Sequence, residues 1–280
     1  MFKSLSPGAI GVKVSSLAEG LDLAARHGFE GYHFSIGEAA QLGAAQVKEL
    51  AASKGVRLSA WGFPVNYRGS EADWRRDLEG LPRLARAGAE LGARRTATWI
   101  MPCSDELTYE QNFKFHGERL KPAASILAEQ GIRLGLEYIT PRTLWTSKKY
   151  PFAHNMGQMQ ELAGAIGPNV GFLMDSWHWH CAGETIGDLG RLSPEQVVDV
   201  HVNDAPAGVP LDQQVDNVRA LPGETGVIDI AGFLKALKQI GYDGPVMVEP
   251  FSERVRKMGP EEACAATAAA LGKVWSLAGL

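Results

Sequence analysis

Four apolar stretches in the second half of the chain each lead to a side chain that can ligate a metal or move a proton. They end, in order, at Glu137, Asp175, His201 and Glu249. Nearly continuous apolar runs of this kind are typical of parallel strands that are buried on both faces. Since the carboxyl ends of such strands meet at one rim of a barrel, the four side chains are expected to converge there.

This set of donors predicts a metal site. A single acidic residue after a strand is more often a helix cap or a surface charge, but four in the same position are hard to explain as caps. Three converging carboxylates repel one another unless a cation offsets their charge. One imidazole with three carboxylates is a hard, oxygen-rich set that suits Mn²⁺, Mg²⁺ or Co²⁺, with Zn²⁺ as an alternative.

The elements that must position these residues alternate between short strand-forming runs and longer helix-forming runs. Eight runs are predicted as strands: Ala9–Val14, Gly31–Phe34, Arg57–Trp61, Thr96–Met101, Ile132–Tyr138, Val170–Asp175, Val197–Asn203 and Val246–Glu249. One strand and one helix in roughly 35 residues is typical of an eightfold barrel. An open doubly wound sheet would usually carry a Gly-rich loop after its first strand, and Ser15–Ala18 is not one. We therefore predict an α/β fold, with residues 1–280 forming a single (β/α)8 TIM barrel.

Composition excludes several classes of function. The 280 residues carry 28 Lys and Arg against 32 Asp and Glu, a formal charge of −4, which gives no general attraction for nucleic acid. No apolar stretch approaches the ~18 residues of a membrane span. The first residues lack the apolar core of a secretory signal, so we expect a cytoplasmic protein. Three scattered cysteines, Cys103, Cys181 and Cys264, are too few for a disulfide framework or a cysteine-based zinc site.

The series Glu137, Asp175, His201, Glu249 resembles the metal site of the xylose isomerase-like TIM barrels, the sugar phosphate isomerase/epimerase superfamily. The resemblance covers essentially the whole chain. Its most specific pieces are Gly135–Glu137, Met174–His178, Val200–Asp204, Leu221–Asp229, Gly241–Pro245 and Val248–Glu249. It implies a metal-dependent enzyme of carbohydrate metabolism, with a small sugar as its partner and a homo-oligomer as one option for its assembly.

The resemblance also implies a role in substrate binding for His178, which matches a family histidine that contacts substrate beside the metal. The chain also departs from two relatives. Endonuclease IV needs further zinc-binding histidines, and no histidine follows His201. Ketose 3-epimerases usually carry an arginine six residues after that histidine, where this chain has Ala207. Substrate orientation is therefore left to residues such as Asn203, Arg142 or Arg219.

Three weaker candidates for substrate binding come from other strands and loops. His33 lies in the second run and Trp61 ends the third, while Arg142 follows Glu137 by five residues. His33 and Arg142 each have an ordinary structural alternative, a hydrogen-bonded core histidine and an exposed arginine.

The leading hypothesis is a divalent-metal-dependent isomerase or epimerase of a small sugar or keto-sugar. Glu137 and Glu249 would both bind the metal and transfer protons through a metal-stabilised enediolate. The alternative is a dehydratase or lyase, inosose dehydratase-like or keto-glycoside-cleaving, that uses the same enolate. A non-catalytic carbohydrate-binding barrel is the third class, against which the complete ligand set argues.

One connection is unusually long. Residues 205–227, here called the mouth loop, are rich in Pro, Gly, Asp and Gln and follow the predicted seventh strand. Long loops in compact domains are usually functional or disordered. We expect the mouth loop to cover the mouth of the barrel.

Overall fold

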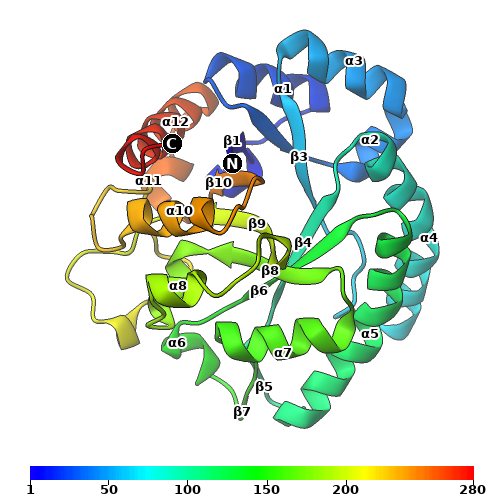
Figure 1. Cartoon of the computed structure of the whole chain (residues 1–280), viewed down its shortest axis with the longest axis vertical. Coiled ribbons are helices and arrows are strands. Elements are labelled where there is room, and N and C mark those ends of the chain that lie inside the picture. The colour runs from blue at the N-terminus through cyan, green and yellow to red at the C-terminus, as the bar shows by residue number, and fades with distance from the viewer.

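The computed structural model describes residues 1–280 and contains a closed barrel of eight parallel strands. Neighbours around the barrel follow the order β1, β10, β9, β8, β6, β4, β3, β2, and Figure 1 shows the helices surrounding them. The barrel strands are β1 (Phe2–Leu5), β2 (Gly31–Phe34), β3 (Arg57–Gly62), β4 (Arg95–Ile100), β6 (Arg133–Tyr138), β8 (Val170–Asp175), β9 (Val197–Val202) and β10 (Pro245–Val248). The predicted fold is confirmed.

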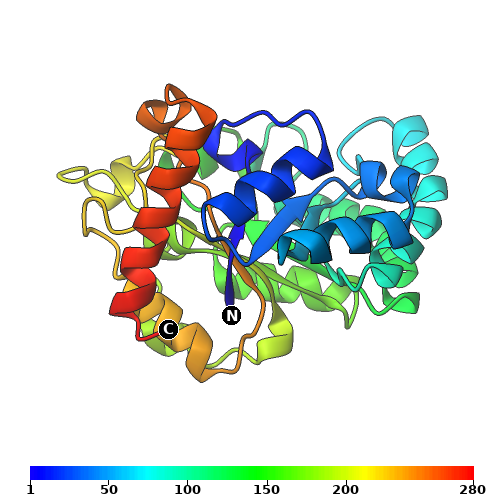
Figure 2. The ribbon, with the colours of Figure 1, turned by 90° about the horizontal axis from the view of Figure 1, so that it is seen from above.

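Longer helices form the outer layer. They are α1 (Leu17–Arg26), α2 (Ile36–Leu42), α3 (Ala44–Lys54), α4 (Glu71–Glu90), α5 (Tyr109–Glu129), α7 (Met156–Ile166), α10 (Ile230–Gln239) and α12 (Pro260–Leu277). Figure 2 shows α12, in red, beside α1, in blue, and the two helices are in contact, so the last helix closes the ring against the first. None of the helices is both long and apolar enough to cross a membrane.

Short elements lie in the connections. They are the helices α6 (Arg142–Trp145), α8 (Ser176–Cys181), α9 (Ile186–Leu189) and α11 (Glu253–Arg256), the 3-10 turns η1 (Gly8–Ile10), η2 (Pro194–Gln196) and η3 (Leu211–Gln213), and the small antiparallel pair β5 (Cys103–Ser104) and β7 (Tyr150–Pro151). Several of these, α6, α8 and η3 among them, follow strands at the carboxyl end of the barrel.

The first strand is not where the sequence suggested. The run Ala9–Val14 was expected to be a strand, but residues 8–10 form η1 and the first strand is Phe2–Leu5. Pro7 precedes this turn, and Gly11 ends it at φ +80°, a conformation that breaks extended backbone. The true strand is short and carries Lys3 and Ser4, so it lacks the apolar run by which the other strands were found.

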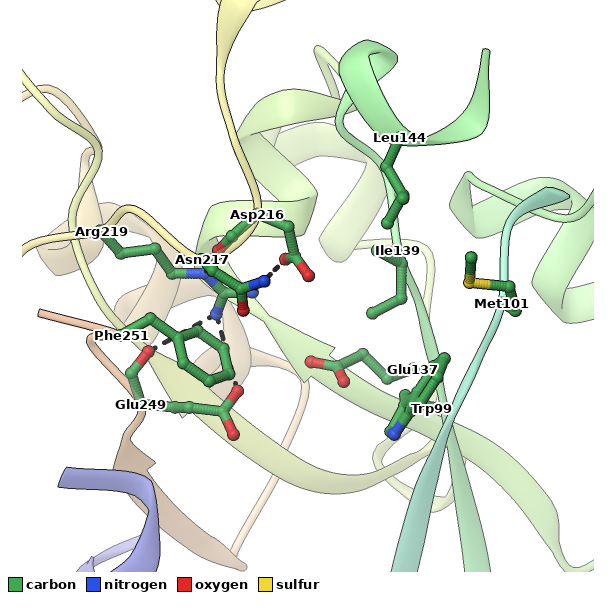
Figure 3. A pocket seen from close by; sticks show the side chains of 10 residues that line it. All are labelled: Trp99, Met101, Glu137, Ile139, Leu144, Asp216, Asn217, Arg219, Glu249 and Phe251. Atoms are coloured by element: carbon green, nitrogen blue, oxygen red, sulfur yellow. Dashed lines mark hydrogen bonds and ion pairs between the residues drawn. The ribbon is translucent and has the colours of Figure 1, made fainter. Parts of the chain in front are cut away.

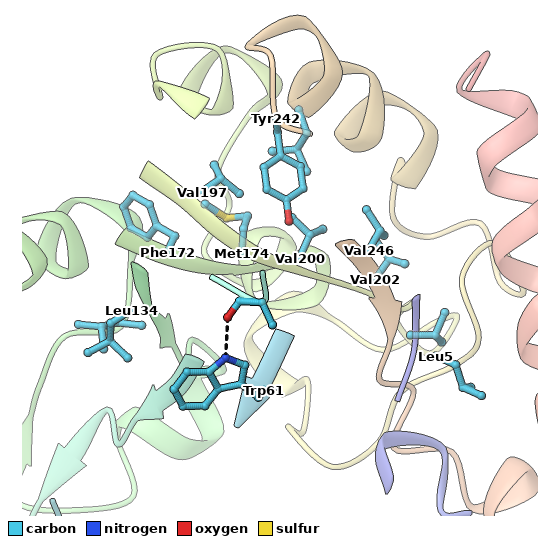
Figure 4. Close-up of a cluster of buried hydrophobic side chains, with 14 of the residues drawn as sticks. Leu5, Trp61, Leu134, Phe172, Met174, Val197, Val200, Val202, Tyr242 and Val246 are labelled. Carbon is cyan, nitrogen blue, oxygen red and sulfur yellow. Dashed lines mark hydrogen bonds between the residues drawn. The ribbon is translucent and has the colours of Figure 1, made fainter. Parts of the chain in front are cut away.

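The core lies between the barrel and its helices, and Figure 4 shows a part of it. Alternate residues of β9, such as Val200 and Val202, pack there with Val246 of β10, and all three are buried. Gly171 shows how closely neighbouring backbone approaches, because a Cβ at this position would lie 2.3 Å from the carbonyl oxygen of Gln196. This packing holds the carboxyl ends of β6, β8, β9 and β10 in a fixed arrangement.

Candidate metal centre

The four predicted ligands meet at the carboxyl end of the barrel. Glu137 lies on β6, Asp175 ends β8, His201 lies on β9, and Glu249 directly follows β10. One ligand atom from each of the four lies within 4.8 Å of the others. His201 Nδ1 is 3.3 Å from Glu249 Oε2 and 3.9 Å from Glu137 Oε1. Glu137, Asp175 and His201 are buried, and Glu249 is partly exposed to the cavity.

The residues fit a divalent metal ion. Glu137 Oε1 is buried and has no hydrogen-bond partner, although a buried carboxylate oxygen normally needs one. Burial, and after it the Glu249 carboxylate, raises the pKa of Glu137 well above its ordinary value. Burial by itself would lower the pKa of His201, but Glu249 and Glu137 raise it to about 10. The site therefore attracts positive charge, and its donors are three carboxylates and one imidazole, a set suited to a divalent cation.

Asp175 is held in place from three sides. Its Oδ1 accepts hydrogen bonds from the backbone N–H groups of Trp177 at 2.6 Å and His178 at 3.2 Å, so the carboxylate also caps α8. Its Oδ2 accepts from Asn203 Nδ2 at 2.9 Å and from Arg219 Nη1 at 3.1 Å. The side chain is thus fixed before any ion binds.

Arg219 reaches the centre from the mouth loop. Its guanidinium lies 4.7 Å from the ring centres of both Trp177 and Phe251, and its side chain is only 1% exposed. Besides Asp175, it pairs with Asp216 at 2.7 Å and lies 3.6 Å from Glu249 Oε2. The guanidinium of Arg219 is therefore held firmly between aromatic rings and carboxylates.

His178 presents a hydrogen-bond donor to the site. Its Nδ1 accepts a hydrogen bond from the backbone N–H of Thr140 at 3.2 Å. Burial, and then Arg219, lowers the pKa of His178 well below its ordinary value, so the ring is neutral and carries its proton on Nε2. Arg219 Nη2 lies 3.1 Å from this Nε2. Because a guanidinium can only donate, these are two donors side by side, and both face Asp216 Oδ1, which lies 2.7 Å from Nη2 and 3.6 Å from Nε2.

A cavity of about 370 Å³ opens over these groups, and Figure 3 shows its lining. Glu137 and Glu249 point toward one another from opposite sides of it (Figure 3). Trp99, Met101, Ile139, Leu144 and Phe251 form the apolar part of its wall. A second cavity of about 380 Å³ adjoins it and shares Trp99, Glu137, Glu249 and Phe251.

The remaining predicted residues are not all at this site. His33 lines the second cavity, where its Nε2 is 4.0 Å from Asp199 Oδ2. Arg142 is exposed and begins α6, where it lines a separate cavity with Trp145 and His154.

Trp61 requires a correction. It was expected to line the pocket, but its side chain is completely buried and its Nε1 donates to the carbonyl oxygen of Ala93 at 3.0 Å (Figure 4). A Cβ on Gly88 of α4 would lie 3.3 Å from its ring. The side chain therefore faces the helical layer, because successive residues of a strand point to opposite sides of the barrel.

The mouth loop lies where the sequence suggested, and Asp216, Asn217 and Arg219 from it line the cavity. Asp204 ties its two ends together, because its carboxylate accepts from the backbone N–H of Gly226 at 2.8 Å and of Ile228 at 3.0 Å.

Two residues that contact Arg219 were not predicted from the sequence. Asp216 precedes Arg219 by three residues in the mouth loop, and this pairing of opposite charges was the one signal that could have identified it. Phe251 has φ +36°, which is costly for a residue with a side chain, and its ring covers Arg219. No sequence pattern indicates that conformation.

Comparison with known proteins identifies the family. The model of the xylose isomerase-like TIM barrel family matches residues 21–273. The chain belongs to this family. A solved xylose isomerase domain protein from Alicyclobacillus acidocaldarius is 34% identical, with a TM-score of 0.88 over 100% of both chains.

Two further proteins are similar to this chain. An inosose isomerase from Bacillus velezensis is 27% identical over 61% of this chain, and the match spans only 59% of that enzyme's length. The IOLI protein, whose crystal structure holds a zinc atom, has a TM-score of 0.78 at 20% identity, with 99% of this chain and 98% of that chain covered. The latter likeness shows the fold alone.

Proposed function

We propose that the protein is a divalent-metal-dependent isomerase or epimerase of a small sugar or keto-sugar. The observation that carries this proposal is the pair Glu137 and Glu249, two carboxylates that face each other across one cavity (Figure 3). Glu137, Asp175, His201 and Glu249 would hold the metal. When bound there, a divalent ion would polarise the substrate carbonyl and acidify the neighbouring C–H bond.

The two glutamates supply the proton transfers. One carboxylate removes the proton from the carbon beside the carbonyl, which leaves an enediolate. The other returns a proton, either to the opposite face of the same carbon, which is epimerisation, or to the adjacent carbon, which is isomerisation. Epimerisation requires the two carboxylates to lie on opposite sides of the substrate. Glu137 approaches from β6 and Glu249 from the end of β10.

Substrate binding falls to the donors beside the carboxylates. A substrate hydroxyl or carbonyl oxygen that takes the place of Asp216 Oδ1 would accept from the Nε2–H of His178 and from Arg219 Nη2. Apolar side chains such as Trp99 and Phe251 can pack on the C–H face of a sugar ring. The inosose isomerases among the relatives make a cyclic polyhydroxy ketone the first substrate to test.

The same donors favour a second candidate, a dehydratase or lyase. After proton removal, a substituent on the next carbon can leave as water or an alcohol if the glutamate that took the first proton passes it to the departing oxygen and a neighbouring group stabilises that oxygen. Arg219 and His178 lie beside the carboxylates and can do so. The products then distinguish the two reactions, because elimination gives an unsaturated ketone and no proton is returned to carbon.

The test is proton NMR of candidate ketones, inosose first, in D₂O with the Mn²⁺-loaded protein. We expect deuterium at the carbon beside the carbonyl and a new isomer. Glu137→Gln and Glu249→Gln should each lose at least ~10²-fold in turnover, with metal content measured in parallel. Glu79→Gln changes an exposed carboxylate on α4 and should behave as wild type. Wild-type turnover by both glutamine variants would overturn the two-carboxylate mechanism.

A further inference from the structure

A cavity of different chemistry lies at the amino-terminal end of the barrel, the end away from the candidate metal centre. It measures about 600 Å³. Three strands that are neighbours in the barrel begin there with arginine: β3 with Arg57, β4 with Arg95 and β6 with Arg133. Arg94, just before β4, adds a fourth guanidinium to the lining.

The charges around this cavity are poorly balanced. Arg95 and Arg133 are direct partners in the register of β4 and β6, an arrangement in which like charges destabilise a sheet. Only Arg95 of the four forms an ion pair, with Asp243 at 2.6 Å, and that carboxylate is 84% exposed. Burial, and after it the Arg95 guanidinium, lowers the pKa of Arg133. An anion between these groups would relieve the repulsion.

The four arginines differ in how many of their donors the protein uses. Arg95 donates to the carbonyl oxygen of Val198 at 2.9 Å, and Arg133 donates to that of Glu195 at 3.0 Å, so both also hold the barrel end together. Arg94 makes one hydrogen bond, to the carbonyl oxygen of Gln130 at 2.7 Å. Arg57 lies 4.9 Å from the ring centre of Phe2. Arg57 and Arg94 therefore keep most of their five donors free for a ligand.

The position of Arg94 is itself determined by its surroundings. Gly131, at φ +64°, faces its guanidinium, and a Cβ there would lie 2.6 Å from Nη1. The glycine thus leaves the room that the guanidinium occupies. The rest of the lining includes the hydroxyl-bearing Ser59 and the apolar Phe2, Leu58 and Leu91, so a ligand would meet an apolar wall beside the cationic one.

We propose that this cavity binds the phosphate group of a small phosphorylated molecule. Guanidinium forks match phosphate oxygens bidentately, and several of them around one cavity favour a dianion over a singly charged carboxylate. The formal charge of −4 does not oppose phosphate binding. It is a sum over the whole chain, whereas an anion in this cavity meets the local charge of four arginines. The site is separate from the metal centre and does not depend on the function proposed for it.

The experiment is calorimetric titration with inorganic phosphate at constant ionic strength. We expect saturable binding to wild type and a loss of at least ~10-fold in affinity in Arg57→Gln and in Arg94→Gln, the least committed of the four arginines. Arg86→Gln removes an exposed arginine of α4 and should leave the affinity unchanged. Asp175→Asn, which disrupts the metal centre, should also leave it unchanged. Thermal unfolding of each variant verifies that it is folded.

Three results would overturn the proposal. The first is the absence of saturable phosphate binding to wild type. The second is a loss of affinity in Asp175→Asn with none in the arginine variants, which would place the phosphate at the metal centre. The third is equal binding of acetate at the same ionic strength, which would make the cavity a general anion site instead of a phosphate site.

Discussion

Replacing Asp175 by Asn should abolish tight metal binding while leaving the local structure largely in place. The amide oxygen of Asn can still accept from the N–H groups of Trp177 and His178, and Asn is a good residue at a helix N-cap. The amide nitrogen, however, replaces the oxygen that faces Asn203 and Arg219. Each charge-assisted hydrogen bond lost there is worth ~1.5–3 kcal/mol. A part of this free-energy cost is offset, because Asn no longer buries a negative charge beside the other carboxylates.

The metal-dependent part of the stability can be calculated separately. A metal ion at 100 times its dissociation constant stabilises the folded state by ~2.7 kcal/mol. The unfolding entropy of a chain of 280 residues is ~0.6 kcal/mol per degree, so the melting temperature should rise by about 4–5 °C. If the substitution weakens binding ~100-fold, the same metal concentration contributes only ~0.4 kcal/mol, which is less than about 1 °C.

The assay is thermal unfolding of wild type and of Asp175→Asn, each with and without Mn²⁺, Co²⁺ or Mg²⁺, together with elemental analysis. Glu79→Gln, on the exposed face of α4, is the matched control and should keep the full metal-dependent rise. His201→Ala should behave as Asp175→Asn does. A full rise in melting temperature and stoichiometric metal in Asp175→Asn would refute the assignment of Asp175 as a ligand.

Three further outcomes are expected. Arg219→Met should lower kcat/KM by about 10–100-fold while metal stays bound, because it removes a substrate donor but no ligand; unchanged kcat/KM would contradict that role. Limited proteolysis should cut the mouth loop less once substrate is bound and more in Arg219→Met, since Arg219 ties that loop to the centre; equal cleavage in every case would argue against a closing loop. Gly171→Ala should cost about 1–3 kcal/mol of unfolding free energy in a chemical denaturation curve, because its Cβ would meet the carbonyl oxygen of Gln196, whereas Gly80→Ala in the open interior of α4 should be neutral or slightly stabilising.

The sequence by itself determined the barrel and the convergence of its four candidate ligands. Parallel strands buried on both faces must be apolar nearly throughout, so Glu137, Asp175, His201 and Glu249 stood out as the polar residues that end such runs. The rule that strand ends share one rim then placed them together without any coordinates. It failed for the first strand, because Phe2–Leu5 is short and partly polar while the apolar residues after it form a turn.

The tertiary structure alone decided which other side chains meet the ligands. Trp61 lies near the end of a strand as the candidate ligands do, yet it faces the helices. Which side it takes depends on where the strand begins and on the register irregularity between β2 and β3. Asp216 and Arg219 come from a loop without periodicity, so nothing in their spacing predicts that Arg219 reaches Asp175 with Asp216 beside it. The cluster of Arg57, Arg95 and Arg133 is likewise invisible in a chain of net negative charge, because only the closed barrel brings the beginnings of β3, β4 and β6 side by side.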